Sequence, residues 1–146
     1  MPDSVSRERR LDHVGLNVAD LDAAEQWYAA AFGYERDFAA RLDVFELDIV
    51  MLIHPTRGDR LELLHRPGSR PGLRAETPPD AVLTQGLGHV AFDVLGVDEA
   101  FYRLVSLGAR PVMEPRPSPE PGVRMAFVAD PEGNLVELLD RSGTGA

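Results

Sequence analysis

Residues 11–18 read LDHVGLNV, and residues 87–94 read LGHVAFDV. The likeness returns later in each copy, where residues 61–64 read LELL and residues 136–139 read VELL. A self-similarity of this kind predicts two copies of one supersecondary unit. Each copy has a histidine near its start and a glutamate near its end, so the two pairs should occupy equivalent places in the fold.

Each copy predicts a strand, a helix and a β-hairpin. Apolar and polar residues alternate in the opening stretches, which is typical of strands. We expect hairpins from residues 44–53 and 60–64 in the first copy, and from residues 124–129 and 134–139 in the second. A further strand near Val112 would complete the second unit. The fold class predicted is therefore α+β, built from two β-α-β-β units in which a third hairpin-side strand is expected.

The helices carry recognisable ends. Asp20 or Asp22 is suited to cap the first helix and Asp98 to cap the second, because an aspartate accepts from backbone N–H groups of the first turn. Gly33 and Gly108 lie where these helices should stop.

The chain is expected to divide into five parts: a flexible N-terminal tail at 1–10, a first module at 11–66, a linker at 67–86, a second module at 87–141 and a C-terminal tail at 142–146. The linker is long for a structureless loop, so we expect a short helix around residues 79–83 or a lid. Residues 113–122 contain four prolines and predict a second long loop.

Composition and charge exclude several classes of function. The 146 residues carry a formal net charge of −9, which argues against nucleic acid and anionic membranes as partners. No apolar run is long enough for a membrane span, and residues 1–10 do not read as a signal peptide. Cysteine is absent, so a thiol nucleophile or a Cys-type zinc site is excluded. We expect a soluble, cytoplasmic protein.

The histidines and glutamates of the repeat form a candidate metal site. His13 and His89 are opposite in parity to the apolar residues of their strands, and Glu62 and Glu137 each lie between two apolar neighbours. A carboxylate in an apolar strand is costly unless it is paired or binds a metal. Two imidazoles and two carboxylates would hold one divalent first-row ion and leave positions open for substrate.

The repeat also resembles a known superfamily. Residues 10–141 resemble the vicinal oxygen chelate superfamily, which includes glyoxalase I, methylmalonyl-CoA epimerase, fosfomycin-resistance enzymes, bleomycin-binding proteins and extradiol dioxygenases. The segments that carry the resemblance are residues 11–16, 27–28, 32–33, 61–64, 88–92 and 127–138.

The resemblance implies paired βαβββ modules that form a curved, barrel-like mixed sheet around a metal cleft. His13, Glu62, His89 and Glu137 fall on the metal-ligand positions, and this set looks like that of bacterial glyoxalase I. It implies one divalent ion (Ni, Co, Zn or Mn), a small-molecule substrate chelated through neighbouring oxygens, and a homodimer. Whether the cleft forms within one chain or between two stays open at this point.

The predicted chemistry is the enolisation of a small carbonyl or thioester compound by a metal-dependent lyase or isomerase. A divalent ion polarises the carbonyl, and a nearby carboxylate removes the α-proton. The resemblance gives that role to Glu137. Glu46 is a second candidate base, because the resemblance to the epimerases implies a non-ligand catalytic glutamate near this place, 16 residues before Glu62. If the longer hairpin shifts that alignment, Asp43 or Asp48 would take the role.

Two other readings stay open. The first is an oxygenase or a thiol transferase on the same scaffold. The second is a non-catalytic protein that binds a small molecule such as an antibiotic.

Overall fold

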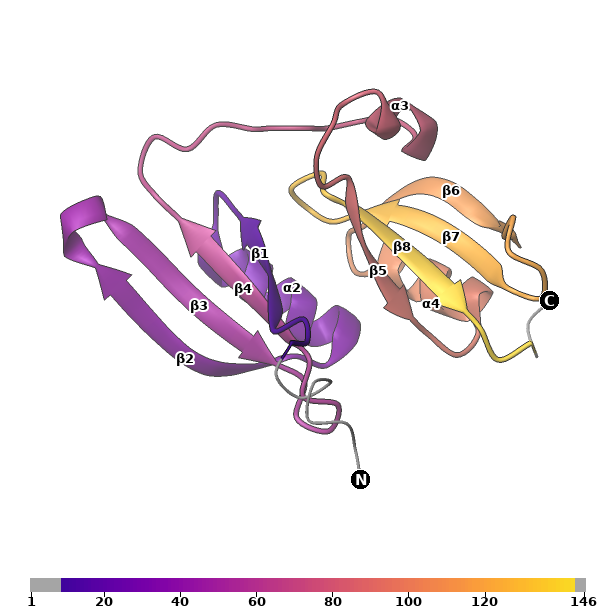
Figure 1. Ribbon diagram of the computed structural model, residues 1–146, viewed down its shortest axis with the longest axis horizontal. Helices are drawn as coiled ribbons and strands as arrows, with labels where there is room; N and C mark the ends of the chain where they lie inside the picture. Colours follow the sequence, from indigo (N-terminus) through magenta and orange to yellow (C-terminus); the bar gives the residue numbers. More distant parts are fainter. Residues whose placement is uncertain (1–8, 144–146) are drawn as a thin grey trace. The chain divides into compact units, whose positions relative to one another are not determined.

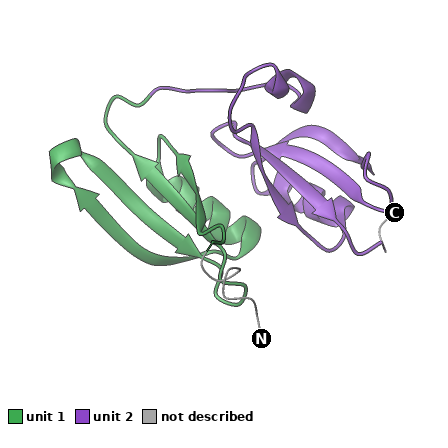
Figure 2. Cartoon of the chain, viewed as in Figure 1, with its two compact units in different colours: residues 1–69 green, residues 70–146 purple. Residues whose placement is uncertain are grey.

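The computed structural model describes residues 9–143 and divides the chain into two units, residues 1–69 and 70–146 (Figure 2). Each unit contains an open four-stranded mixed sheet with one long helix against it (Figure 1). The predicted α+β class and the two βαβββ modules are confirmed. No helix between residues 9 and 143 is long and apolar enough to span a lipid bilayer.

Unit 1 follows the predicted order. Its elements are β1 (His13–Asn17), α2 (Leu21–Phe32), β2 (Glu35–Leu42), a 3₁₀ turn η1 (Asp43–Phe45), β3 (Leu47–Ile53) and β4 (Arg60–His65). The strand order is β1-β4-β3-β2, in which β1 runs parallel to β4 and the other pairs are antiparallel. Trp27 and Tyr28 of α2 are buried, as are Leu52, Leu61 and Leu63 of the sheet.

Unit 2 repeats this plan. Its elements are α3 (Pro78–Val82), β5 (His89–Asp93), α4 (Val97–Ser106), β6 (Arg110–Pro117), β7 (Arg124–Ala129) and β8 (Leu135–Asp140). The strand order is β5-β8-β7-β6, again with one parallel pair, β5 and β8. Phe101 and Leu104 of α4 are buried, and so are Val128 and Leu138 of the sheet.

The helix ends agree with the sequence except at the start of α4. Asp20 caps α2 by accepting from the N–H of Ala23 at 3.0 Å, and Gly33 ends the helix with φ +77°. The cap predicted at Asp98 is wrong, because the N-cap of α4 is Gly96. Asp98 instead pairs with Arg124 of β7 at 2.6 and 2.9 Å, a partner far away in sequence.

Two predicted boundaries also move. Residues 43–45 form the 3₁₀ turn rather than the start of a strand, so β3 begins at Leu47. The loop predicted at 113–122 is wrong over its first half, where β6 continues to Pro117. This strand tolerates prolines because it lies at the sheet edge and pairs with β7 through two register shifts, so fewer of its N–H groups are needed.

Candidate functional site

In unit 1, parallel pairing of β1 with β4 brings His13 and Glu62 together. Gly15 is the ladder partner of Glu62, so His13, two residues before Gly15, lies on the same face of the sheet as the glutamate. The Nε2 atom of His13 is 3.6 Å from Oε1 of Glu62, and the side chains are 34% and 21% exposed. The small residue at position 15 leaves space beside the carboxylate, since a Cβ there would be 3.7 Å from Oε1.

Unit 2 contains the equivalent pair. Ala91 is the ladder partner of Glu137, and His89 lies two residues before it on the same face. The Nε2 atom of His89 is 3.0 Å from Oε2 of Glu137, and the side chains are 42% and 16% exposed. Each βαβββ unit therefore places one imidazole nitrogen beside one carboxylate.

The sequence did not indicate two neighbours of these pairs. The carboxylate of Asp12 accepts a hydrogen bond from Nδ1 of His13 at 2.7 Å. This bond is the main reason that the pKa of His13 is raised, and the charge of Glu62 raises that pKa further. The same bond lowers the pKa of Asp12. In unit 2 the ring of Phe127 meets His89 edge-on, with centroids 5.3 Å apart. Adjacency to His13 was the only sequence signal for Asp12, and Phe127 gave none.

Glu46 does not join the pair of its own unit. It follows the 3₁₀ turn between β2 and β3, is exposed and has φ +52°. Met51 of β3 is opposite Glu62 in the ladder, and Glu46 precedes Met51 by five residues, outside the strand. Its role as a base stays a prediction. The alternatives Asp43 and Asp48 both bind Arg41.

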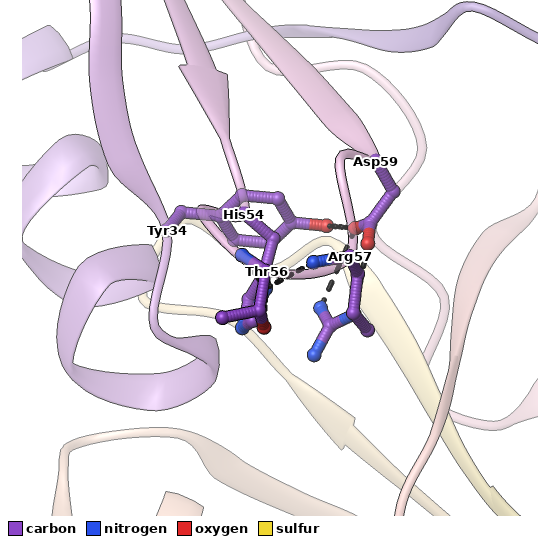
Figure 3. Close-up of polar contacts among 5 residues, drawn as sticks. All are labelled: Tyr34, His54, Thr56, Arg57 and Asp59. Carbon is purple, nitrogen blue, oxygen red and sulfur yellow. Dashed lines mark hydrogen bonds and ion pairs between the residues drawn. The ribbon is translucent and has the colours of Figure 1, made fainter.

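The two remaining histidines, His54 and His65, form hydrogen bonds with backbone groups. Nδ1 of His54 accepts from the N–H groups of Thr56 and Arg57, at 3.4 and 3.2 Å, in the turn between β3 and β4 (Figure 3). Beside it, the hydroxyl of Tyr34 donates to Asp59 at 2.5 Å. Burial and this carboxylate raise the pKa of Tyr34.

The hydrogen bond from Arg57 holds the pKa of Asp59 below its usual value. His65 uses Nδ1 to donate to the carbonyl of Val18 at 2.8 Å. Among residues 9–143, no three histidine or acidic side chains gather into a metal site.

Comparisons with known proteins agree with this architecture. Residues 10–138 match the family model described as the glyoxalase/bleomycin resistance protein/dioxygenase superfamily. A probable lactoylglutathione lyase from Synechocystis is 27% identical over 134 residues, which is 89% of this chain and 94% of that protein.

Solved structures are also similar. A glyoxalase family protein from Bacillus cereus is 25% identical with a TM-score of 0.72, covering 90% of this chain and 93% of its own. The trypanothione-dependent glyoxalase I of Leishmania major is 25% identical with a TM-score of 0.67, covering 91% of this chain and 87% of its own. The chain belongs to the glyoxalase/bleomycin resistance protein/dioxygenase superfamily.

Proposed function

We propose that this protein is a metal-dependent lyase or isomerase that enolises a small carbonyl or thioester substrate. The observation that carries the proposal is the repeated pair, with an imidazole Nε2 beside a carboxylate oxygen at 3.6 Å in one unit and 3.0 Å in the other. If these residues only stabilised the fold, the two units would not need the same imidazole–carboxylate pair at the same place.

The donor chemistry fits a divalent first-row ion. Imidazole nitrogen and carboxylate oxygen both suit nickel, cobalt, zinc and manganese. His13, Glu62, His89 and Glu137 would together hold one ion, two donors from each unit. The hydrogen bond that Nδ1 of His13 donates to the carboxylate of Asp12 supports this role, because ligating histidines usually hold their second nitrogen against a carboxylate or carbonyl.

The ion, when bound, would polarise the carbonyl of a chelated substrate. Glu137 would take the proton from the adjacent carbon and return it to the product, the step shared by hemithioacetal isomerisation and thioester epimerisation. Phe127, edge-on to His89, would keep water from one side of the reacting carbon. The similarity to a probable lactoylglutathione lyase favours the hemithioacetal form of this reaction.

Two measurements test the proposal. Elemental analysis of untagged protein, reconstituted separately with Ni²⁺, Co²⁺, Zn²⁺ and Mn²⁺, should find one ion per site. The loaded protein should then exchange the α-hydrogen of the methylglyoxal–glutathione hemithioacetal, or of methylmalonyl-CoA, with deuterium from the solvent. Stoichiometric metal without exchange would favour the oxygenase or thiol-transferase reading, and failure to bind any of the four ions would favour a binding protein.

The proposal includes a homodimer in the cytoplasm. A chain without cysteine loses no disulfide in a reducing compartment. Light scattering should give a mass of twice the 16.0 kDa of one chain. A mass of one chain at working concentration would contradict the dimer.

A further inference from the structure

The segment at residues 73–82 packs on the face of the unit 2 sheet that carries the second His–Glu pair. Ala81 of α3, 4% exposed, forms a buried cluster with Phe127 and Leu135, and Leu73 and Ala75 pack against that cluster. This segment belongs to unit 2 and not to unit 1, and Figure 1 shows α3 on the side of the second sheet where β6 lies. The segment is thus a docked part of unit 2.

The docked segment reaches the pair through two side chains of the sheet. Phe127 is directly opposite Glu137 in the ladder of β7 and β8, and Leu135 is the ladder partner of His89. The ring of Phe127 also meets the ring of His89. Phe127 and Leu135 therefore pack against the docked segment and are also the ladder partners of the pair.

Contacts outside the cluster hold the segment in place. The side chain of Arg74 crosses Gly133 in the turn between β7 and β8, where a Cβ would be 2.5 Å from Cδ of the arginine. The backbone of Gly133 has φ +91°, so both its conformation and this close approach favour glycine. Glu76 adds a weak, exposed ion pair to Arg110 at the start of β6, at 3.9 Å.

We propose that residues 73–82 are a fixed wall of the substrate site, and that Leu73 sets the size of the group a substrate can place beside the His89–Glu137 pair. The proposal rests on the proposed function. Leu73 suits this role because it packs against the cluster of Ala81, Phe127 and Leu135 and is itself only partly buried, so part of its apolar side chain stays accessible. An apolar wall of this kind would discriminate between substrates by their volume. One methylene group more or less in an apolar pocket changes the ratio of kcat/KM values by about 10- to 200-fold.

Trypsin tests the docking without any substrate. Arg74–Ala75 is the one bond of the linker that trypsin can cut, because Arg66 and Arg70 are each followed by proline. Ala81→Asp would bury an unpaired carboxylate and release the segment. We expect cleavage at residue 74, followed by mass spectrometry, to be at least about tenfold faster than in the wild type, since cleavage follows the population of the open form.

Val82→Asp is the matched control, because Val82 is the next residue of α3 and is 81% exposed. It should be cut at the wild-type rate. Should Ala81→Asp unfold unit 2 as judged by circular dichroism, Leu73→Ser provides a milder release and should still accelerate cleavage. Equal rates in the wild type and in the released variants would overturn the docked wall.

The size selection is tested with two hemithioacetals of glutathione, formed from methylglyoxal and from phenylglyoxal. Leu73→Ala should shift the ratio of kcat/KM toward the phenyl substrate by at least about tenfold. Val82→Ala should leave the ratio unchanged, and an unchanged ratio in Leu73→Ala would overturn the selectivity role. A wild-type protein that converts neither substrate counts against the proposed function instead, while the trypsin result still decides the docking.

Discussion

Single residues make the two His–Glu pairs unequal. Asp12 holds the ring of His13 through Nδ1, but glycine stands at the equivalent position 88, so His89 has no such neighbour before it. A carboxylate that orients an imidazole makes it a firmer ligand. Unit 1 would then anchor the ion, which leaves the carboxylate of unit 2 as the better candidate to leave the ion and carry a proton.

Glu137→Gln tests that assignment. The amide keeps the size of the side chain but cannot accept the substrate proton, so we expect turnover to fall by at least about 10²-fold. Glu114→Gln, which changes an exposed carboxylate of β6, is the control and should keep normal rates. Near-normal turnover in the Glu137 variant, measured at saturating metal, would move the base to Glu46 or elsewhere.

Asp140 is a second residue whose charge matters, here for stability. It is 2% exposed and accepts from the hydroxyl and N–H of Ser142 and from the N–H of Gly96 at the start of α4. These bonds, with the Ser142 hydroxyl first, lower its pKa from the usual 3.8. Since the folded pKa is the lower one, the stabilisation is complete above the unfolded pKa and is lost as the pH falls through the folded pKa.

We therefore expect Asp140→Asn to lower the free energy of unfolding at pH 7, because one amide oxygen cannot satisfy three donors. The loss should shrink on acidification below the usual aspartate pKa of 3.8. Urea titrations of the wild type and of Asp140→Asn between pH 2 and pH 7 give the free energy of unfolding of each protein as a function of pH. Parallel curves over that range would mean that Asp140 contributes nothing through its charge.

At the scale of elements, the sequence predicted what local patterns determine. Strand parity predicted that the histidine and the glutamate of each copy share one face of their sheet, because alternation in a strand depends only on neighbouring residues. The errors came from distant partners. Asp98 pairs with Arg124 instead of capping its helix. Pairing with β7 extends β6, a proline-containing edge strand whose local sequence predicts a loop.

The end of α2 offers a prediction for an element. Gly33 has φ +77°, and a Cβ there would be 3.4 Å from Nε2 of His54, in the turn drawn in Figure 3. Gly33→Ala should therefore destabilise the protein by about 1 kcal/mol, as measured by chemical unfolding. Gly72→Ala is the control, since nothing lies within 4 Å of that position and its φ is not positive. We expect it to be neutral, and an equal loss in both variants would contradict the argument.

At the scale of the whole molecule, the sequence predicted a duplicated fold because the two repeats share one pattern, and it predicted the superfamily because the motifs lie at matching places. The docked segment could not be predicted in this way. Leu73 and Ala81 show no periodicity that identifies a buried face, and their burial depends on Phe127 and Leu135, which are distant in sequence.

In the proposed site each unit would supply two of the four donors, so the ion would couple the two units. Binding to the folded state alone adds RT ln(1 + [ion]/Kd), about 2.7 kcal/mol at a free concentration 100 times Kd. We expect Ni²⁺ to raise the Tm of metal-free protein, and EDTA to reverse the rise. His13→Ala and His89→Ala, one change in each unit, should each abolish it. His65→Ala should lower the starting Tm, since that ring holds the Val18 carbonyl, yet keep the rise. A rise that survives in either of the first two variants would show that the ion does not need both units.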